Sequence, residues 1–567
     1  MDMRRMFFSF IAGLLVAASS PSFADEITSS LQFPIDHNRT CRPDETPCLP
    51  WSAGLTTGHK ELHPLFPVKT MRFVIPQNQI LKSVKLETGP EQTIANYQPV
   101  LAPRQVPMSG ASDSHRVTPA WSFHPFPAQP LEIRTHHFRG ITTVEVKIYP
   151  LQVRRNETVY FKDATVHILT EPRRDTPELQ RNLVRDYEEA AALADNGAQF
   201  STPSTASDSP IGYLIIGPSA LIGADGNSPL QPLINEKRSR GLTVSMATLE
   251  SVSPSKDPAQ IRAFIKSKYQ QESIDYVLLI GDKSRLPWKY LSAGGADAES
   301  EPIPSDQYYA CLDGTFDTPA NYDWACEVAV GRIGAKTTQD VSNWVAKTLQ
   351  LQQISKDARR NKKVINFAEK LDDSTLGSWV MEYLVSGRTG TPQTVGFPQS
   401  TAWSKAYDTF SQEVSAGEFV SMINGGDIHI VNHLGHSNDS YNMRLNSSDL
   451  GQFQGRPMFV FSQGCYPNDP DTDNFTIMAV RMAQHGPAAM ISNTRYGWYE
   501  PGQEGEGSSA ILHRIFWSTH FANGVRTIGA MNHKAKEIFI GTDQSSLAVY
   551  TALESNLIGD PELDLGN

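Results

Sequence analysis

The stretch Tyr276-Val277-Leu278-Leu279-Ile280-Gly281-Asp282 is an apolar run that ends in a glycine and a carboxylate. Such a run is typical of a strand buried on both faces, as in a parallel sheet. Residues 261–269 before it carry apolar side chains at helical spacing, and 213–217 and 242–246 resemble further strands. The segment between those two, 232–240, reads as a helix that ends at Gly241. Alternating strands and helices predict a parallel sheet covered on both faces.

The same alternation continues toward the C-terminus. Strands are expected at 328–331, 363–368, 427–432, 458–462 and 488–492, with a helix near 338–355. We therefore expect an α/β fold with two doubly wound subdomains, at residues 211–355 and 356–567.

The first 24 residues have the pattern of a signal peptide. Arg4 and Arg5 precede an apolar run at 7–18, and Ser22-Phe23-Ala24 is a small-x-small cleavage site. No other stretch approaches the roughly 18 to 20 apolar residues that a membrane span requires. We expect an exported protein, secreted or periplasmic, without a membrane span.

Residues 25–186 have the sequence pattern of an antiparallel β region. Short strand-like runs at 71–76, 80–86, 142–148 and 158–169 are separated by proline and turn residues. Residues 187–210 follow, rich in Ala, Ser, Thr, Asp, Gly and Pro, and are interpreted as a linker. Because exposed linkers are preferred sites of proteolysis, we expect a pro-region that is removed by a cut between about 173 and 210.

Charge and cysteine content narrow the classes of function. The formal net charge is -11 and no basic stripe is present, so a nucleic-acid partner is not expected. Of the five cysteines, Cys41 with Cys48 and Cys311 with Cys326 suit two local disulfides. Cys465 is left over, either as an inert buried side chain or as a reactive one.

Two apolar strands end in reactive side chains. Residues 428–434 lead into Gly435-His436-Ser437, and residues 458–463 lead into Gly464-Cys465. In parallel sheets, ligands bind at the carboxyl ends of strands, so neighbouring strands would bring both side chains to one crevice. A thiolate nucleophile requires an imidazole that holds the thiol deprotonated and later protonates the leaving group. His436 and Cys465 meet that requirement.

The blocks 432–437 and 459–465 resemble the His and Cys motifs of the gingipain family of cysteine peptidases. Further blocks in the family's order lie at 303–309, 328–332, 367–369 and 556–563, so the resemblance covers about 210–565. It implies a caspase-like fold and a cysteine endopeptidase that hydrolyses proteins or peptides through a thioester acyl-enzyme.

By this resemblance Cys465 is the nucleophile, His436 is the base and acid, and the N–H groups of Ser437 and Cys465 are the oxyanion donors. Glu369 matches an acidic residue near the catalytic His, with a solvated Glu at a strand end as the alternative. The family usually has Gly where this chain has Ser437, which costs free energy if the position requires a positive φ.

The resemblance also points to residues that bind substrate. Trp498 falls where the family lines its substrate pocket, with core packing as the alternative. Asp372 and Asp373 follow the strand that ends at Ala368, and a carboxylate there would select Arg or Lys before the cleaved bond. The alternative is that these two residues only begin a helix.

No cofactor is required by this chemistry. The acidic stretches 313–323 and 469–473 offer oxygen ligands of the kind calcium takes, so calcium is a candidate structural ion. Neither stretch matches an EF-hand loop, and solvated turns are the alternative. The sequence does not indicate an oligomeric state.

Other classes of function compete with this interpretation. A metal-dependent hydrolase would use the crowded His429, His433 and His436, but the His-Glu-x-x-His pattern of zincin helices is missing. A non-catalytic binding or adhesion protein could retain the peptidase fold. A serine hydrolase is disfavoured because the sequence has no Gly-x-Ser-x-Gly elbow.

Overall fold

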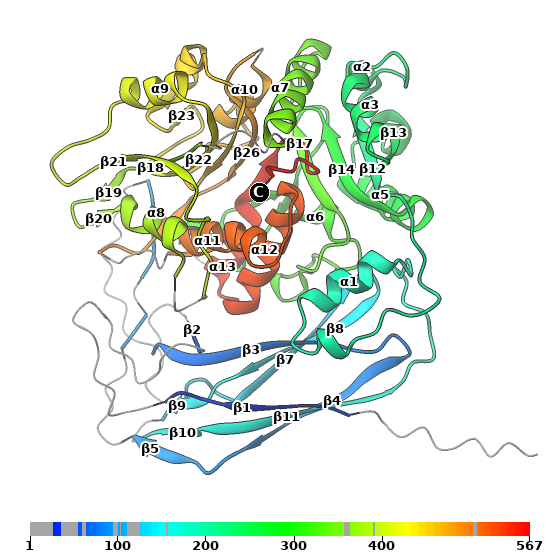
Figure 1. The fold of residues 1–567 in the computed structure, drawn as a ribbon, viewed down its shortest axis with the longest axis vertical. Helices are drawn as coiled ribbons and strands as arrows, with labels where there is room; N and C mark the ends of the chain where they lie inside the picture. The colour runs from blue at the N-terminus through cyan, green and yellow to red at the C-terminus, as the bar shows by residue number, and fades with distance from the viewer. Residues whose placement is uncertain are drawn as a thin grey trace, which may run out of the picture.

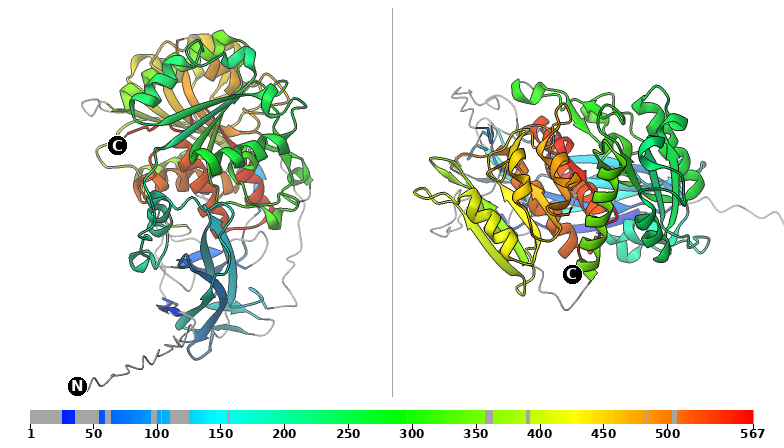
Figure 2. Two further views of the ribbon diagram at one scale, coloured as in Figure 1. Left: turned by 90° about the vertical axis from the view of Figure 1, so that its right-hand side faces the viewer. Right: turned by 90° about the horizontal axis from the view of Figure 1, so that it is seen from above.

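A β region and an α/β unit lie one above the other in this chain (Figures 1 and 2). The structure, a computed structural model, describes residues 26–35, 55–58, 64–94, 100–102, 104–109, 125–154, 157–295, 297–356, 363–388, 392–482, 484–502 and 507–566. The N-terminal strands, blue to cyan in Figure 1, form the lower layers, and the remaining chain forms the upper unit.

One ten-stranded sheet organises the α/β unit. Its order is β13 (Thr243–Thr248), β12 (Gly212–Gly217), β14 (Ile274–Ile280), β17 (Ala329–Ile333), β28 (Ser555–Ile558), β26 (Pro487–Asn493), β25 (Met458–Ser462), β22 (Ile428–Leu434), β18 (Lys363–Ala368) and β21 (Ala402–Tyr407). All neighbours pair in parallel except β26 and β28, which are antiparallel. The predicted α/β fold with a parallel sheet is confirmed, and β28 joins the two halves into one sheet.

The strands are apolar throughout because both faces of the sheet are covered. Val277 and Leu279 of β14 belong to one apolar cluster, whereas Leu278 and Ile280 belong to the other. The first cluster includes residues of α4 (Leu249–Val252), α5 (Pro258–Glu272), α6 (Gln307–Ala310), α8 (Gly377–Ser386), α11 (Ser508–Phe521), α12 (Ile528–Thr542) and α13 (Ser546–Glu554). The second includes residues of α2 (Ser219–Ile222), α3 (Gln231–Ser239), α7 (Thr338–Lys356), α9 (Ala416–Gly425) and α10 (Phe475–Arg481).

Local sequence signals fix several helix ends. Pro232 lies in the first turn of α3, where its missing N–H costs no hydrogen bond. Gly241 follows the helix with a φ of +90°, a conformation that glycine adopts without strain. Helix α9 begins at a capping box between Ser415 and Glu418.

The N-terminal region is antiparallel, as the sequence predicts. One sheet contains β1 (Glu26–Gln32), β11 (Asp163–Pro172) and β4 (Gln79–Thr88), and another contains β2 (Thr56–Gly58), β3 (Phe66–Val74), β8 (Ile141–Ile148) and β7 (Leu131–Phe138). A third contains β5 (Gln92–Ile94), β10 (Thr158–Tyr160) and β9 (Leu151–Val153). Alternate residues of β3, β8 and β11 form a shared apolar core.

The segment interpreted as a linker contains regular structure. Helix α1 spans Val184–Ala192 and is followed by a single 3₁₀ turn at Gly197–Gln199. The side chain of Asn196 pairs with both the N–H and the C=O of Val74, at 2.8 and 2.9 Å. Polar side chains that bind main chain therefore hold this segment against β3, although it is poor in apolar residues.

Some predictions fall outside the described residues: the signal peptide at 1–24, and Cys41 with Cys48. Within the described residues, Cys311 and Cys326 are joined and Cys465 is free. Across the described residues, none of the helices combines the length and the apolar character that crossing a membrane requires.

Arg139 connects the β region to the α/β unit. It and Gly140 form the two-residue turn between β7 and β8, with φ values of 50° and 76°. Its buried guanidinium lies 2.7 Å from Asp186 and 3.5 Å from Asp275, and its Nε donates to the carbonyl of Glu327 at 3.1 Å. A single cation thus links the hairpin, α1 and the large sheet.

We predict that Arg139→Leu destabilises the chain by about 2 kcal/mol, because the buried carbonyl of Glu327 loses its donor. Asp186 and Asp275 keep Arg181 and Arg185 as partners. The midpoint of urea unfolding, followed by fluorescence, measures this loss. Arg134→Leu is the matched control, since Arg134 lies in the same hairpin in a partly exposed pair with Glu132 at 3.5 Å. The control should change stability by less than about 1 kcal/mol. Equal effects of the two substitutions would contradict this account of the docking.

Candidate active site

The loops that follow β22 and β25 form the centre of the site. These strands are parallel neighbours in register from Ile430 opposite Phe459 to His433 opposite Ser462. Their carboxyl ends therefore lie at the same edge of the sheet, and His436 and Cys465 follow these two ends. The prediction that these two strands are neighbours is confirmed.

A close approach of main chains joins the two loops. A Cβ on Gly464 would lie 2.0 Å from Ser437 Oγ and 3.1 Å from the Gly435 carbonyl, so only glycine fits. The Ser437 hydroxyl donates to the carbonyl of Cys465 at 2.8 Å. Among the described non-glycine residues, Tyr466 has a positive φ (60°) and Ser437 does not. Ser437 therefore carries no left-handed strain and contributes a contact that glycine would lack.

Glu369 binds the loop that carries His436. Its side chain is 2% exposed, accepts the main-chain N–H of His436 at 3.3 Å and lies 3.2 Å from Nε2 of His433. His433 is fully buried and its other ring nitrogen contacts Ser462. Glu369 is thus close to the predicted catalytic histidine, but it holds the main chain of that residue instead of its ring.

The predicted oxyanion donors are free to bind substrate. Within the described part of the chain, neither the N–H of Ser437 nor that of Cys465 has a hydrogen-bond acceptor. Two unpaired N–H groups that flank a nucleophile can stabilise the charge of a tetrahedral intermediate. Both belong to loops that are held by the contact between Ser437 and Cys465.

A segment of the N-terminal region lies across this centre. Strand β6 (Val106–Pro107) pairs antiparallel with β27 (Trp498–Tyr499), and the N–H of Met108 donates to the carbonyl of Gly497 at 2.8 Å. The side chain of Gln105 accepts the N–H of Ser508 at 2.7 Å. Such main-chain pairing is a general way for a protein to hold an extended peptide.

Met108 touches both predicted catalytic residues. Its carbonyl is hydrogen-bonded to Nδ1 of His436, and its main chain is one of the polar groups beside the Cys465 thiol. The Met108 side chain is completely buried. The sequence analysis missed residues 105–108 because nothing in their local pattern indicates a contact with a site more than 300 residues away.

The covering segment leaves Cys465 in a dry environment. Its side chain is 1% exposed, and Sγ lies 3.7 Å from the carbonyl of Gly497. Burial raises the pKa of the thiol far above its usual value because the charged thiolate is poorly solvated there. Cys465 is therefore a protonated thiol in this arrangement of the chain.

The comparisons with known proteins show the family of this chain. The family model described as "Peptidase family C25" matches residues 206–566. The chain belongs to this family, the gingipain family of cysteine peptidases. It is a cysteine peptidase, and its substrates are proteins or peptides. Comparison with curated proteins gives no match.

Solved structures of gingipains from Porphyromonas gingivalis are similar to this C25 peptidase. The complex of the pro- and mature domains of RgpB is 18% identical, with a TM-score of 0.48, over 62% of this chain and 79% of that one. The Arg-specific gingipain R (RgpB) is 20% identical, with a TM-score of 0.47, over 64% and 80%. A structure on the zymogenic latency of gingipain K is 13% identical over 27% of this chain and 100% of that one, with a TM-score of 0.19.

The predicted substrate-binding residues of this C25 peptidase have different surroundings. Trp498 is 4% exposed and packs edge-on against Tyr550, beside the covering segment. Asp372 accepts hydrogen bonds from Tyr499, Ser374 and Thr375. The side chain of Asp373 is fully exposed and lies 3.3 Å from Lys370. Asp373 therefore does not point into a desolvated pocket.

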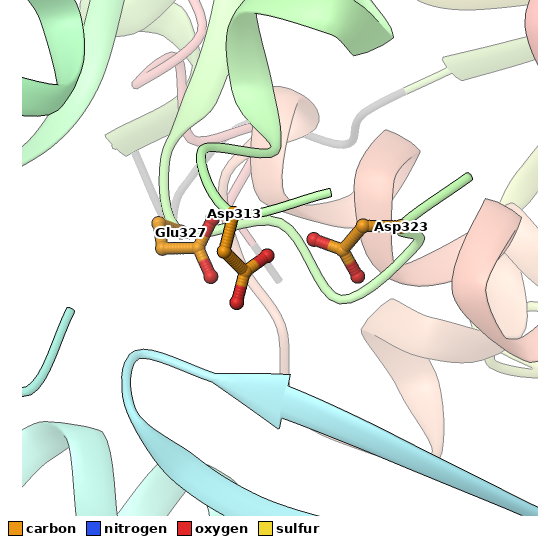
Figure 3. A group of neighbouring side chains, drawn as sticks. All are labelled: Asp313, Asp323 and Glu327. Atoms are coloured by element: carbon orange, nitrogen blue, oxygen red, sulfur yellow. The ribbon is translucent and has the colours of Figure 1, made fainter. Parts of the chain in front are cut away.

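The two acidic stretches differ in how their carboxylates are satisfied. Asp469 and Asp471 pair with Arg495, at 3.0 and 3.3 Å, and Asp473 pairs with Arg481 at 2.7 Å. In contrast, carboxylate oxygens of Asp313, Asp323 and Glu327 lie within 4.8 Å of one another (Figure 3). Oδ2 of Asp323 and Oε1 of Glu327 are buried and have no hydrogen-bond partner among the described residues.

The three crowded histidines do not share a site. His429 contacts the carbonyl of Leu565, His433 contacts Ser462 and Glu369, and His436 contacts Met108. Among the described residues, the acidic cluster is the one group of His, Cys, Asp and Glu spaced to hold a metal ion. The geometry thus gives no support to a histidine-bound catalytic metal.

We predict that Gly464→Ala reduces peptidase activity by about 100-fold, since its Cβ would displace the catalytic loops by roughly 1 Å. Gly451→Ala is the matched control, because a Cβ at Gly451 meets nothing within 4 Å. Hydrolysis rates and melting temperatures of both variants test this. Full activity in Gly464→Ala would show that the close approach is not required.

Proposed function

We propose that this C25 peptidase is an endopeptidase in which Cys465 and His436 form the catalytic dyad. The observation that carries the proposal is the position of Met108, whose carbonyl is hydrogen-bonded to His436 and whose main chain lies beside the Cys465 thiol. A substrate peptide must occupy that position for its carbonyl carbon to be attacked. The unpaired N–H groups of Ser437 and Cys465 support the assignment of the oxyanion hole.

The reaction follows from these positions. His436 takes the proton of the Cys465 thiol, and the thiolate adds to the scissile carbonyl to give an oxyanion held by the two N–H groups. The C–N bond then breaks, with the proton passing from His436 to the leaving amine, and a thioester remains. Water, deprotonated by His436, hydrolyses the thioester and regenerates the thiol. Glu369 keeps His436 in place through its main-chain N–H.

We further propose that residues 25–186 are a pro-region that blocks the site until it is removed. The support is that residues 105–108 occupy the place of a substrate and bury the nucleophile. The position of the activating cut between about 173 and 210 stays a prediction, as does export to the periplasm or beyond by the signal peptide at 1–24.

The resemblance to gingipains also predicts a preference for Arg or Lys before the cleaved bond, which we replace below with a preference for another side chain. A preference for Arg or Lys requires an ionised carboxylate beside the bound side chain. Asp372 is the better placed of the two predicted acidic residues, through its contact with Tyr499 of β27, and its oxygens already accept four hydrogen bonds. Asp373 is exposed and offers no such pocket.

We predict that Cys465→Ala and His436→Ala each reduce peptide hydrolysis at least about 1,000-fold, because the two side chains act as one unit. The melting temperature should change little, and initial rates on a mixed peptide library measure the loss. His520→Ala on α11 is the control, since the contacts of that ring are local, with Phe521 and the carbonyl of Val525.

Retention of activity in either dyad variant would contradict the assignment. Absence of activity in the unsubstituted chain, both before and after removal of the N-terminal region, would instead favour a non-catalytic binding or adhesion protein.

We also propose that Asp313, Asp323 and Glu327 hold a structural calcium ion. Calcium takes about six to eight oxygen ligands, with carboxylates preferred. The two orphaned buried oxygens of Asp323 and Glu327 support this, because a buried carboxylate oxygen without a partner is costly. The ion would neutralise this loop beside the Cys311–Cys326 disulfide and would take no part in the reaction.

We predict that calcium raises the thermal unfolding temperature of the full chain and that Glu327→Gln abolishes the rise. The expected stabilisation is about 2.7 kcal/mol at a free calcium concentration 100 times the dissociation constant. Asp317→Asn is the control, because Asp317 lies exposed in the same loop outside the cluster. A calcium response that survives in Glu327→Gln would refute the site, as would no response to calcium after treatment with a chelator.

A further inference from the structure

The side chain that fills the substrate position is apolar and unbranched. Met108 is completely buried and belongs to the same apolar cluster as Cys465, Trp498 and Tyr499. Its N–H pairs with the carbonyl of Gly497, and its own carbonyl is hydrogen-bonded to His436 and not to the N–H groups of Ser437 and Cys465. Met108 is therefore the residue of the covering segment that contacts the dyad, with its carbonyl beside the oxyanion site and not in it.

We propose that this peptidase prefers an unbranched apolar residue such as Met immediately before the cleaved bond. The inference deepens the proposed function and rests on it, since it names the substrate class of the same site. Trp498 pairs with the segment that carries Met108 and gives the binding site an aromatic component. Thioethers pack favourably against aromatic rings and adapt to irregular apolar spaces.

The carboxylates around the thiol are poorly suited to a basic side chain. Glu301 accepts the hydroxyls of Tyr466 and Tyr550 and lies 3.5 Å from Arg495. Asp372 is occupied by Tyr499 and by its own loop. An Arg or Lys buried beside them would lack a free anionic partner, and an uncompensated buried charge is strongly destabilising.

Glu554 is a further carboxylate near the thiol, and it predicts the opposite preference, for a basic side chain before the cleaved bond. It is completely buried at the end of α13, and neither of its oxygens has a hydrogen-bond partner among the described residues. Burial, followed by the charge of Glu301, raises the pKa of Glu554 well above its usual value, which favours the neutral carboxylic acid. A substrate guanidinium that reached Glu554 would favour its ionised form, and the pocket would then accept Arg.

The test uses the full chain and substitutes the residue that occupies the pocket. The readout is the rate at which Cys465 is labelled by two peptidyl ketone probes, Gln-Val-Pro-Met and Gln-Val-Pro-Arg, each with a leaving group that the thiolate displaces. Peptide mapping identifies the labelled cysteine. We expect slow labelling of the unsubstituted chain, because Met108 covers the thiol.

Met108→Gly and Met108→Arg should both speed the labelling at least 10-fold, because glycine leaves the pocket empty and arginine does not fit it. The Met probe should then react at least 10-fold faster than the Arg probe. Ile133→Ala is the control, since Ile133 is 40% exposed on β7 of the same N-terminal region, outside the covering segment, and should leave the rates near those of the parent chain. Melting temperatures show whether each variant is folded.

Slower labelling of Met108→Arg than of the parent chain, or faster reaction of the Arg probe, overturns the proposal. If Glu554→Gln then abolishes the advantage of the Arg probe, Glu554 is the floor of a basic-residue pocket. Failure of both probes to label Cys465 in Met108→Gly refutes the proposed dyad itself, which is a different outcome from a reversed preference.

Discussion

The main chains that follow β22 and β25 lie closer together than any side chain at position 464 would permit. This constraint places the two reactive loops at one edge of the sheet and lets Ser437 donate to the carbonyl of Cys465. Glu369 also holds the loop that follows β22, by accepting the N–H of His436. The free N–H groups, the thiol and the imidazole all depend on this arrangement, because none of them is held by a helix or strand of its own.

The N-terminal region reaches the site through main-chain pairing, which any sequence without a misplaced proline can make. The pairing of β6 with β27 is short, and the further contacts are hydrogen bonds of Met108 to Gly497 and His436, one of Gln105 to Ser508, and the buried Met108 side chain. Each hydrogen bond contributes about 1 kcal/mol and the side chain about 1.5–3 kcal/mol. A covalently tethered segment needs no more binding free energy than this, since its effective concentration at the site is high. Separation of the region from the peptidase unit would remove that advantage and leave only weak contacts over the thiol.

Glu327 connects three features of the molecule. Its main-chain carbonyl accepts the buried guanidinium of Arg139, its carboxylate belongs to the acidic cluster, and Cys326 precedes it in the chain. The surface on which the β region docks is thus continuous with the loop assigned to calcium. Charge at one of these places affects the other, because both lie in a poorly solvated part of the structure.

The sequence alone indicated most strands of the large sheet, its helices α3, α5 and α7, and the two strand ends that carry His436 and Cys465, because a strand buried on both faces leaves a clear apolar run and glycine marks each tight turn. It did not determine that β28 joins the halves antiparallel, that residues 187–210 pack through Asn196, or that Met108 lies on the thiol. These features come from contacts between segments far apart in the chain, made largely by main-chain groups that every residue possesses. Such contacts leave no pattern in the local sequence, so only the tertiary structure decided them.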